Sequence, residues 1–172
     1  MGYDGITIGV ETGDDEMLAF MNKGFQSKDT IEQCKKLEAA NISYNFFYLT
    51  GISGAGRAEI GAKETAKVFN QLHPRIIESS MLTIYKNSEL YEEIQKGNWR
   101  EESEIEKLIE LKTLIENLKI TTRIVTDGAS NLIQVRGNLP KDKEKLMKHL
   151  QYQISNADES VLREYRVNLR HL

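Results

Sequence analysis

The chain has 172 residues, of which 40% are hydrophobic and 28% charged, and its formal net charge is −3. This length suits one well-buried domain or a large part of a bigger one, and the near-balance of charge offers no basic surface to nucleic acid. Apolar runs are only a few residues long, far short of the roughly 20 that cross a bilayer, so no membrane partner is expected. The single cysteine, Cys34, excludes an internal disulfide and is typical of a cytoplasmic protein.

In the first half of the chain, short β-branched runs alternate with longer helical periods, which is typical of parallel α/β units. The pattern predicts strands over residues 5–11, 43–50 and 75–85. It predicts helices over residues 15–21, 27–40 and 58–72. Asp14 or Asp15 is expected to cap the first helix and Ser27 the second. The predicted fold class is therefore α/β with parallel strands.

The second half is predicted to be mainly helical. Its periodicity indicates helices over residues 88–96, 101–118 and 141–154, and a short charged helix from Asp158 onward. The longest of these carries on one side Ile105, Leu108, Ile109, Ile115 and Leu118. Residues 120–126 form the one strand predicted here, and a loop with Gly128 and Gly137 follows it.

Two predicted strands end in polar or glycine-rich segments, Glu11-Thr12-Gly13 and Thr50-Gly51-Ile52-Ser53-Gly54. In parallel α/β folds ligands bind at the carboxyl ends of the strands, because main-chain donors and helix N-termini converge there. Glu11 is thus placed to accept hydrogen bonds from ligand hydroxyls. The alternative is that Glu11 forms an ion pair with a nearby lysine or caps the turn.

The loop from Gly51 to Gly56 would let main chain approach a ligand closely, because glycine has no side chain. It lacks the lysine of a phosphate loop and does not match the dinucleotide fingerprint, so a plain strand-to-helix turn is the alternative. Lys23 lies twelve residues after Glu11, where a lysine also complements the dipole of the preceding helix. A functional role for Lys23 depends on Glu11 belonging to a site.

The residues alone predict no catalytic group and no metal site. Cys34 lies on the apolar face of a helix and is expected to be an inert, buried thiol. The histidines at positions 73, 149 and 171 lack metal-ligand spacing. Ser130 has no evident histidine or carboxylate partner for nucleophilic catalysis.

Several of these segments together resemble the radical S-adenosylmethionine (SAM) enzymes. In that family the fourth strand ends in a glutamate, which is followed by a small hydroxyl residue, glycine and aspartate, and later by a basic residue and glycine. The first part of this pattern is similar to Ile8-Gly9-Val10-Glu11-Thr12-Gly13-Asp14-Asp15-Glu16-Met17-Leu18, and the second part to Met21-Asn22-Lys23-Gly24. The next family strand resembles Ala39-Ala40-Asn41-Ile42 and the run into Gly51-Ile52-Ser53-Gly54. Later segments follow the order of the subgroup labelled Fe–S oxidoreductases, which is similar to the oxygen-independent coproporphyrinogen oxidases.

This resemblance implies roles for individual residues. Glu11 would accept hydrogen bonds from the ribose hydroxyls of SAM, and Lys23 would pair with the methionyl carboxylate as a point charge. The loop from Gly51 to Gly54 would pass close to the adenine, and the strand around Leu82 would offer it main-chain atoms. The implied cofactor-binding residues are Glu11, Thr12, Lys23, Gly51, Gly54 and Leu82.

The family's three-cysteine motif and its glycine-glycine-glutamate element are absent from the sequence. The resemblance therefore implies a chain that begins at the fourth strand of a six-stranded partial barrel. Residues 1–86 would be the C-terminal half of a partial (β/α)6 radical SAM barrel, and residues 87–172 a mainly helical C-terminal extension with one strand. SAM and a [4Fe–4S] cluster are expected in the intact parent, and no cluster is expected in this chain.

The implied parent would cleave SAM reductively at its cluster, and the resulting 5′-deoxyadenosyl radical would abstract hydrogen from a small-molecule or peptide substrate that the sequence does not identify. This chain would hold part of the SAM pocket and would be inactive alone. One alternative is a stand-alone, non-catalytic α/β binding or dimerisation module, because half a barrel leaves a strand edge unpaired and favours a homodimer. Another is a plain α/β domain without a ligand.

Overall fold

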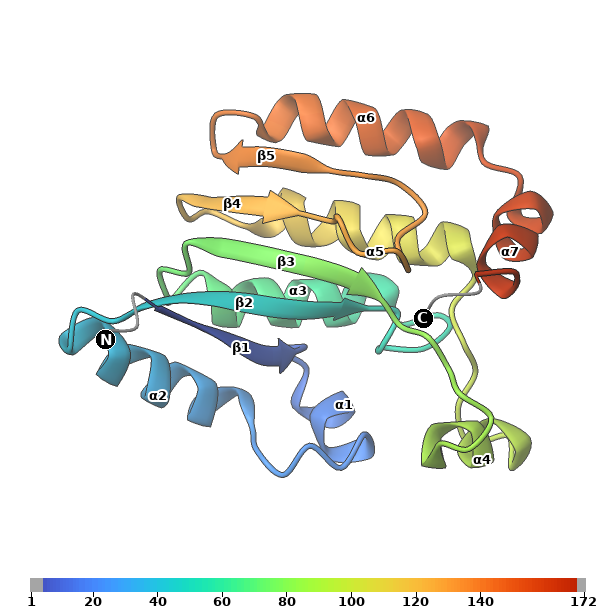
Figure 1. The fold of residues 1–172 in the computed structure, drawn as a ribbon, viewed down its shortest axis with the longest axis horizontal. Coiled ribbons are helices and arrows are strands. Elements are labelled where there is room, and N and C mark those ends of the chain that lie inside the picture. Colours follow the sequence, from blue (N-terminus) through green and yellow to red (C-terminus); the bar gives the residue numbers. More distant parts are fainter. Residues whose placement is uncertain (1–4, 170–172) are drawn as a thin grey trace.

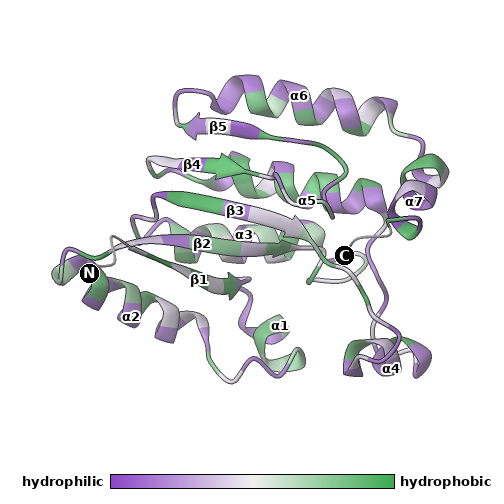
Figure 2. Cartoon of the chain, viewed as in Figure 1, coloured by the Kyte–Doolittle hydropathy of each residue, from purple (hydrophilic) through white to green (hydrophobic). Residues whose placement is uncertain are grey.

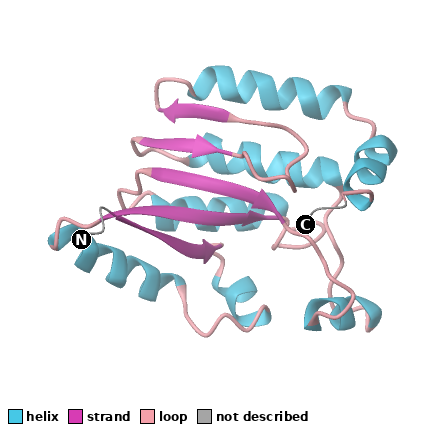
Figure 3. Ribbon diagram, viewed as in Figure 1, coloured by secondary structure: helices cyan, strands magenta, loops and turns pink. Residues whose placement is uncertain are grey.

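A five-stranded sheet runs through the structure, a computed structural model that describes residues 5–169 (Figure 1, Figure 3). The strands lie side by side in the order β1 (Gly5–Glu11), β2 (Ser43–Thr50), β3 (Ile76–Met81), β4 (Thr122–Val125) and β5 (Arg136–Leu139). Neighbouring strands from β1 to β4 are parallel, and β5 runs antiparallel to β4. The predicted α/β class with parallel strands is confirmed.

Helices connect and flank the strands. They are α1 (Asp15–Phe20), α2 (Ser27–Ala39), α3 (Ala58–Phe69), α4 (Glu89–Gln95), α5 (Glu104–Asn117), α6 (Lys143–Asn156) and α7 (Glu159–Val167). Asp14 caps α1 by accepting the N–H of Glu16 at 3.0 Å, as one of the two predicted alternatives. The cap of α2 is Gln26, one residue before the predicted Ser27, in a reciprocal capping box with Asp29. None of the helices within residues 5–169 combines the length and apolar character needed to cross a bilayer.

One face of the sheet is covered by α3 and α5, which lie behind the strands in Figure 1, and α2 and α6 also contribute side chains to the core; within residues 5–169 the near face carries no helix. The side chains of β2 alternate accordingly, since Tyr44, Phe46 and Tyr48 are buried and the residues between them are half-buried. The helices are amphipathic as well: Figure 2 shows that hydrophobic and hydrophilic residues alternate along α2 and α6.

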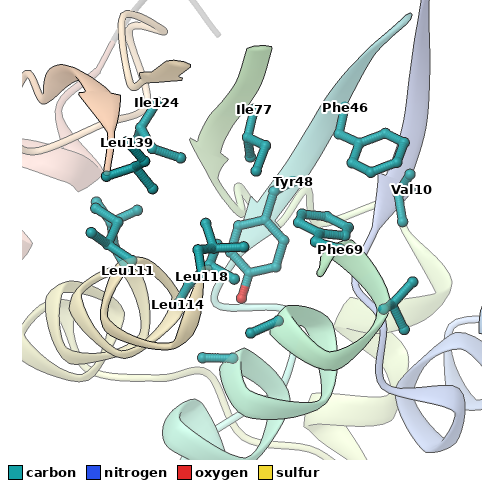
Figure 4. Close-up of a cluster of buried hydrophobic side chains, with 14 of the residues drawn as sticks. Val10, Phe46, Tyr48, Phe69, Ile77, Leu111, Leu114, Leu118, Ile124 and Leu139 are labelled. Carbon is teal, nitrogen blue, oxygen red and sulfur yellow. The ribbon is translucent and has the colours of Figure 1, made fainter. Parts of the chain in front are cut away.

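The hydrophobic core lies mainly between the covered face and α3 and α5 (Figure 4), and it also includes Cys34 of α2 and Leu146 and Leu150 of α6. Phe46 and Phe69 have ring centroids 4.6 Å apart in a tilted arrangement, and both side chains are fully buried. Leu114 of α5 belongs to the same cluster and is likewise fully buried. Burial of such side chains contributes roughly 1.5–3 kcal/mol each, so this layer positions the strand ends relative to the helices.

One additional strand and several boundaries differ from the sequence predictions; among the boundaries, α3 ends at Phe69 and not at residue 72, and α6 begins at Lys143 and not at residue 141. A second strand in the later half, β5, lies where a loop was predicted, so the expectation of one strand there was wrong. Its sequence, Arg-Gly-Asn-Leu, has little β propensity, and it is held by antiparallel pairing with β4. The third strand ends at Met81 and not at residue 85, and the long helix begins at Glu104, after its Ser103 cap, and not at residue 101.

The sheet continues past the predicted division at residue 86, because β4 pairs with β3 from Ile76↔Arg123 to Glu78↔Val125. The division of the chain into a half-barrel and an extension stays a prediction.

Candidate functional site at the carboxyl ends of the strands

Glu11 is the last residue of β1, at the carboxyl edge of the sheet, as predicted. A bulge between Gly9 and Glu11 shifts the register against β2, and Glu11 has a positive φ of 65°. The side chain of Val10 enters the core, whereas a Cβ on Gly9 would lie only 3.1 Å from Oε1 of Glu11. The carboxylate therefore folds back over Gly9 on the uncovered side of the sheet, and the missing side chain of Gly9 makes room for it.

Lys23 is brought to Glu11 by the turn after α1. The N–H of Lys23 donates to the carbonyl of Leu18 at 3.0 Å, and Asn22 takes a left-handed conformation with φ of 51°. Nζ of Lys23 lies 3.6 Å from Oε1 of Glu11, and the two side chains are 31% and 20% exposed. This distance exceeds that of a direct charged hydrogen bond, so the carboxylate keeps lone pairs available to a ligand. The contact also agrees with the alternative of a simple ion pair.

Thr12 has a structural role that the sequence did not reveal. Its hydroxyl is fully buried and lies 3.1 Å from the hydroxyl of Thr65 on α3. The N–H of Gly13 donates to the same Thr65 oxygen at 2.8 Å, and a Cβ on Gly13 would lie 2.6 Å from Cα of Thr65. These contacts fix the end of β1 against α3. A ligand could therefore meet the main chain of Thr12 but not its side chain.

The turn after β2 rests on a buried carboxylate. The N–H of Gly51 donates to Oε2 of Glu110 at 2.7 Å, and the hydroxyl of Tyr48 donates to the other oxygen of that carboxylate. Gly51 has φ of 94°, and a Cβ there would lie 3.1 Å from Cε of Lys107. Gly51 is thus required both by its conformation and by close packing on α5.

Further along the same turn, Gly54 packs against an aromatic ring. Its φ is 79°, and an added Cβ would lie 2.6 Å from Nε1 of Trp99. Leu82, the residue after β3, is also engaged within the chain. Its N–H donates to the carbonyl of Thr50 at 2.8 Å, and its carbonyl accepts from Nη2 of Arg166 at 2.5 Å. In this arrangement both polar main-chain groups of Leu82 have partners.

Charged side chains at the start of α5 are buried beneath these turns. Glu102, Glu104, Lys107 and Glu110 are each at most 1% exposed. Nζ of Lys107 lies 2.8 Å from Glu101 and 3.1 Å from Glu104, so the ammonium is paired. Neither carboxylate oxygen of Glu102 has a hydrogen-bond partner within the described residues. Burial, followed by the negative charge of Glu110, raises the pKa of Glu102 to about 10, and burial also raises the pKa of Glu110.

No family model matches the sequence. The tRNA uridine(34) acetyltransferase of Methanocaldococcus jannaschii is 25% identical over 138 residues, covering 77% of this chain and 25% of that protein. The protein of the same name from Methanocaldococcus infernus is 23% identical over 138 residues, covering 77% of this chain and 26% of its own length. A solved structure of M. infernus Elp3 with an N-terminal deletion matches with a TM-score of 0.63 and 18% identity, over 88% of this chain and 37% of that one.

Elp3 is a radical SAM-family enzyme. The fold of this chain is similar to part of the radical SAM domain of Elp3. The chain spans about a quarter of the length of the curated relatives that it matches. These relatives support the resemblance to radical SAM enzymes but give no support to the narrower Fe–S oxidoreductase subgroup.

The residues of this chain do not fit a radical SAM cluster. Such a cluster needs several thiolates, and the sequence contains one cysteine. Cys34 is buried on the core side of α2, and burial raises the pKa of its thiol to about 11. A thiol in these surroundings is a poor metal ligand, because the thiolate is the binding form. No group of histidine, cysteine or carboxylate side chains among residues 5–169 has the arrangement of a metal site.

Sequence reasoning missed the buried charges of α5. The predicted apolar face included Ile105 and Ile109, which are only half-buried, and omitted Leu111 and Leu114, which are buried. The three- and four-residue spacing of Leu108, Leu111, Leu114, Ile115 and Leu118 was the available signal. Extending that spacing one turn toward the N-terminus reaches Glu104 and Lys107 on the same face.

Proposed function

We propose that this chain forms part of the SAM pocket of a radical SAM enzyme whose other parts lie outside these residues. The observation that carries the proposal is the meeting of Glu11 and Lys23 on the uncovered side of the carboxyl edge, 3.6 Å apart and both accessible. An acceptor and a cation so arranged suit the ribose hydroxyls and the methionyl carboxylate of one ligand. The related fold and the Elp3 relatives support the same reading.

In the proposed pocket, Glu11 accepts hydrogen bonds from the ribose, and Lys23 provides the positive charge for the amino-acid end of SAM. The rigid turn from Gly51 to Gly54, supported by Glu110, forms a wall on the adenine side. In the parent, SAM cleavage at a [4Fe–4S] cluster held by other residues would supply a 5′-deoxyadenosyl radical for hydrogen abstraction. A closer relation to the Fe–S oxidoreductase-like enzymes is proposed on sequence resemblance alone.

The class of substrate is also part of the proposal. The proposed substrate is an unidentified small molecule or peptide, because the composition carries no nucleic-acid signal, whereas the relatives are named for action on a tRNA uridine. A mobility-shift titration of the chain with unmodified tRNA separates these alternatives, since the absence of a salt-sensitive shift supports the first.

The proposal is tested by calorimetric titration of SAM into the purified chain and into Glu11→Gln and Lys23→Gln. A hydrogen bond to a charged group contributes about 1.5–3 kcal/mol, so Glu11→Gln should weaken binding roughly 10- to 100-fold. The matched controls are Glu32→Gln and Lys36→Gln, an exposed ion pair on α2 with an Nζ–Oε1 distance of 2.7 Å. Absence of SAM binding at millimolar ligand, or equal binding by Glu11→Gln and Glu32→Gln, would overturn the proposal.

A second candidate, a non-catalytic dimerisation module, is favoured by the free edge of β1. Within the described residues β1 pairs only with β2, and its other edge has no neighbouring strand. Sedimentation equilibrium separates the two candidates. A concentration-dependent dimer without SAM binding supports the module, and a monomer that binds SAM supports the pocket.

A further inference from the structure

Helix α7 is docked by its polar side. Val161, Tyr165 and Val167 are 61%, 54% and 71% exposed, and among the apolar side chains of the helix only Leu162 is half-buried. The side chains that form hydrogen bonds with the rest of the protein belong to Glu159, Arg163 and Arg166, which share one face through four- and three-residue spacing. This is the reverse of an ordinary surface helix, which buries an apolar stripe. The attachment of α7 therefore depends on charged groups.

The first contact joins α7 to the start of α5. The carboxylate of Glu159 accepts the N–H groups of Glu104 at 2.8 Å and of Ile105 at 2.9 Å. These N–H groups belong to the first turn of α5 and have no partner inside that helix. One turn further along α7, the guanidinium of Arg163 donates to Glu104 at 2.8 Å and also to Glu101.

Arg166 reaches the carboxyl ends of two neighbouring strands. Its side chain is 6% exposed, and Nε lies 3.2 Å from Glu104. Nη2 donates to the carbonyl of Leu82, directly after β3, and Nη1 donates to the carbonyl of Ser130 in the loop after β4. In Figure 1, α7 accordingly stands beyond the carboxyl ends of the strands, next to the start of α5. Arg166 thus occupies main-chain acceptors at the edge where parallel sheets bind ligands.

We propose that α7 is a detachable latch over the carboxyl edge, and that its release frees the carbonyls of Leu82 and Ser130 for a ligand. Because the latch is held mainly by charged contacts, with Leu162 as the half-buried apolar side chain of its docked face, salt weakens it more than it weakens the core. An element held in this way opens at a lower free energy than the sheet that it covers. The identity of the ligand as SAM rests on the proposed function, whereas the latch itself does not.

Amide hydrogen exchange measured by NMR tests the latch directly. The N–H groups of Glu104 and Ile105 report its closure, because their acceptor is Glu159. Between 0.05 and 1 M NaCl the exchange of these two amides and of α7 should accelerate about tenfold, while the amides of β2 remain unchanged. Arg166→Gln should have the same effect at low salt. The matched control, Arg136→Gln, removes an exposed guanidinium paired with Asp127 and should leave these amides unchanged.

Equal exchange at both salt concentrations and in Arg166→Gln would overturn the latch. The salt series on the unaltered chain keeps this test valid even if Arg166→Gln does not fold. In calorimetric titrations, Arg166→Gln should bind SAM about fivefold more tightly than the unaltered chain, since SAM no longer competes with the docking of α7. An open latch with unchanged or weaker SAM binding would overturn the regulatory role. If no variant binds SAM while exchange responds to salt, the proposed function fails and the latch stands.

Discussion

Tyr48 of β2 and Glu110 of α5 are joined by a buried hydrogen bond, and the same carboxylate accepts the N–H of Gly51. Both side chains are fully buried. A single carboxylate thus connects the sheet, a helix and the turn at the end of β2. The position of that turn is set from inside the protein and not by the residues of the turn alone.

Replacing Tyr48 by phenylalanine should therefore destabilise the chain by about 1–3 kcal/mol, because one oxygen of Glu110 loses its buried donor. The urea midpoint, measured with an unchanged m-value, reports this loss. Tyr152→Phe is the control, since that side chain is 64% exposed and should change the free energy of unfolding by less than about 0.5 kcal/mol. Equal midpoints for the two variants would show that the Tyr48–Glu110 contact contributes nothing measurable.

The neighbouring buried carboxyl groups Glu102 and Glu110 predict a free energy of unfolding that falls as pH rises. Burial raises both pKa values, that of Glu102 to about 10, so between the ordinary value of 4.5 and about 10 the folded state binds more protons than the unfolded state. The free energy of unfolding must then decrease with pH across this window. Carboxyl groups with lowered pKa values, such as Glu101, make the free energy of unfolding rise with pH, but only in the acid range, where protonation removes their stabilising contacts.

Glu102→Gln should flatten this dependence and make the chain more stable than the unaltered protein at pH 8.5, because a neutral amide cannot ionise. Urea unfolding at pH 6.0, 7.0 and 8.5 measures the slope. Glu106→Gln, which removes a neighbouring carboxyl whose pKa is lowered, should keep the decline above pH 6. A flat profile in the unaltered chain would mean that the pair is not protonated in the folded state.

The sequence predicted the parts of this molecule that local patterns determine. Strand β2 was predicted with its observed ends, because Tyr44 and the run from Phe46 to Thr50 are apolar or β-favouring. The position of Glu11 at a strand end followed in the same way. The bulge at Gly9 could not be predicted, because it depends on the pairing of β1 with β2, and pairing is a property of two distant segments.

The burial of charge was also beyond sequence reasoning. A lysine such as Lys107 is expected at the surface, and its burial depends on Glu101 and Glu104 meeting it in three dimensions. Likewise, Arg166 lies in a short charged helix that looks solvated in sequence, and its acceptors are the carbonyls of Leu82 and Ser130, far away along the chain. Side-chain to main-chain contacts of this kind leave no trace in residue patterns.

Cys34 should be unreactive in the folded chain. Its side chain is 1% exposed, and burial with the nearby charge of Glu38 raises the pKa of the thiol to about 11. Because the thiolate is the nucleophile, reaction with Ellman's reagent at pH 8 should proceed only through unfolding. The rate should therefore rise steeply with urea near the unfolding midpoint. Rapid modification in the absence of urea would contradict the packing of α2 against the sheet.

Gly9→Ala separates the candidate site from the stability of the fold. The added Cβ would lie 3.1 Å from Oε1 of Glu11, so the carboxylate must move away from its place over the strand. The free energy of unfolding should change by less than about 1 kcal/mol, since no main-chain atom lies within 4 Å of the new methyl group. SAM binding, measured by calorimetry, should weaken about fivefold or more because the acceptor is displaced. Thr7→Ala, a change at an exposed position of the same strand, should leave binding unaltered. If Gly9→Ala binds SAM as tightly as Thr7→Ala does, the orientation of Glu11 over Gly9 has no bearing on the ligand.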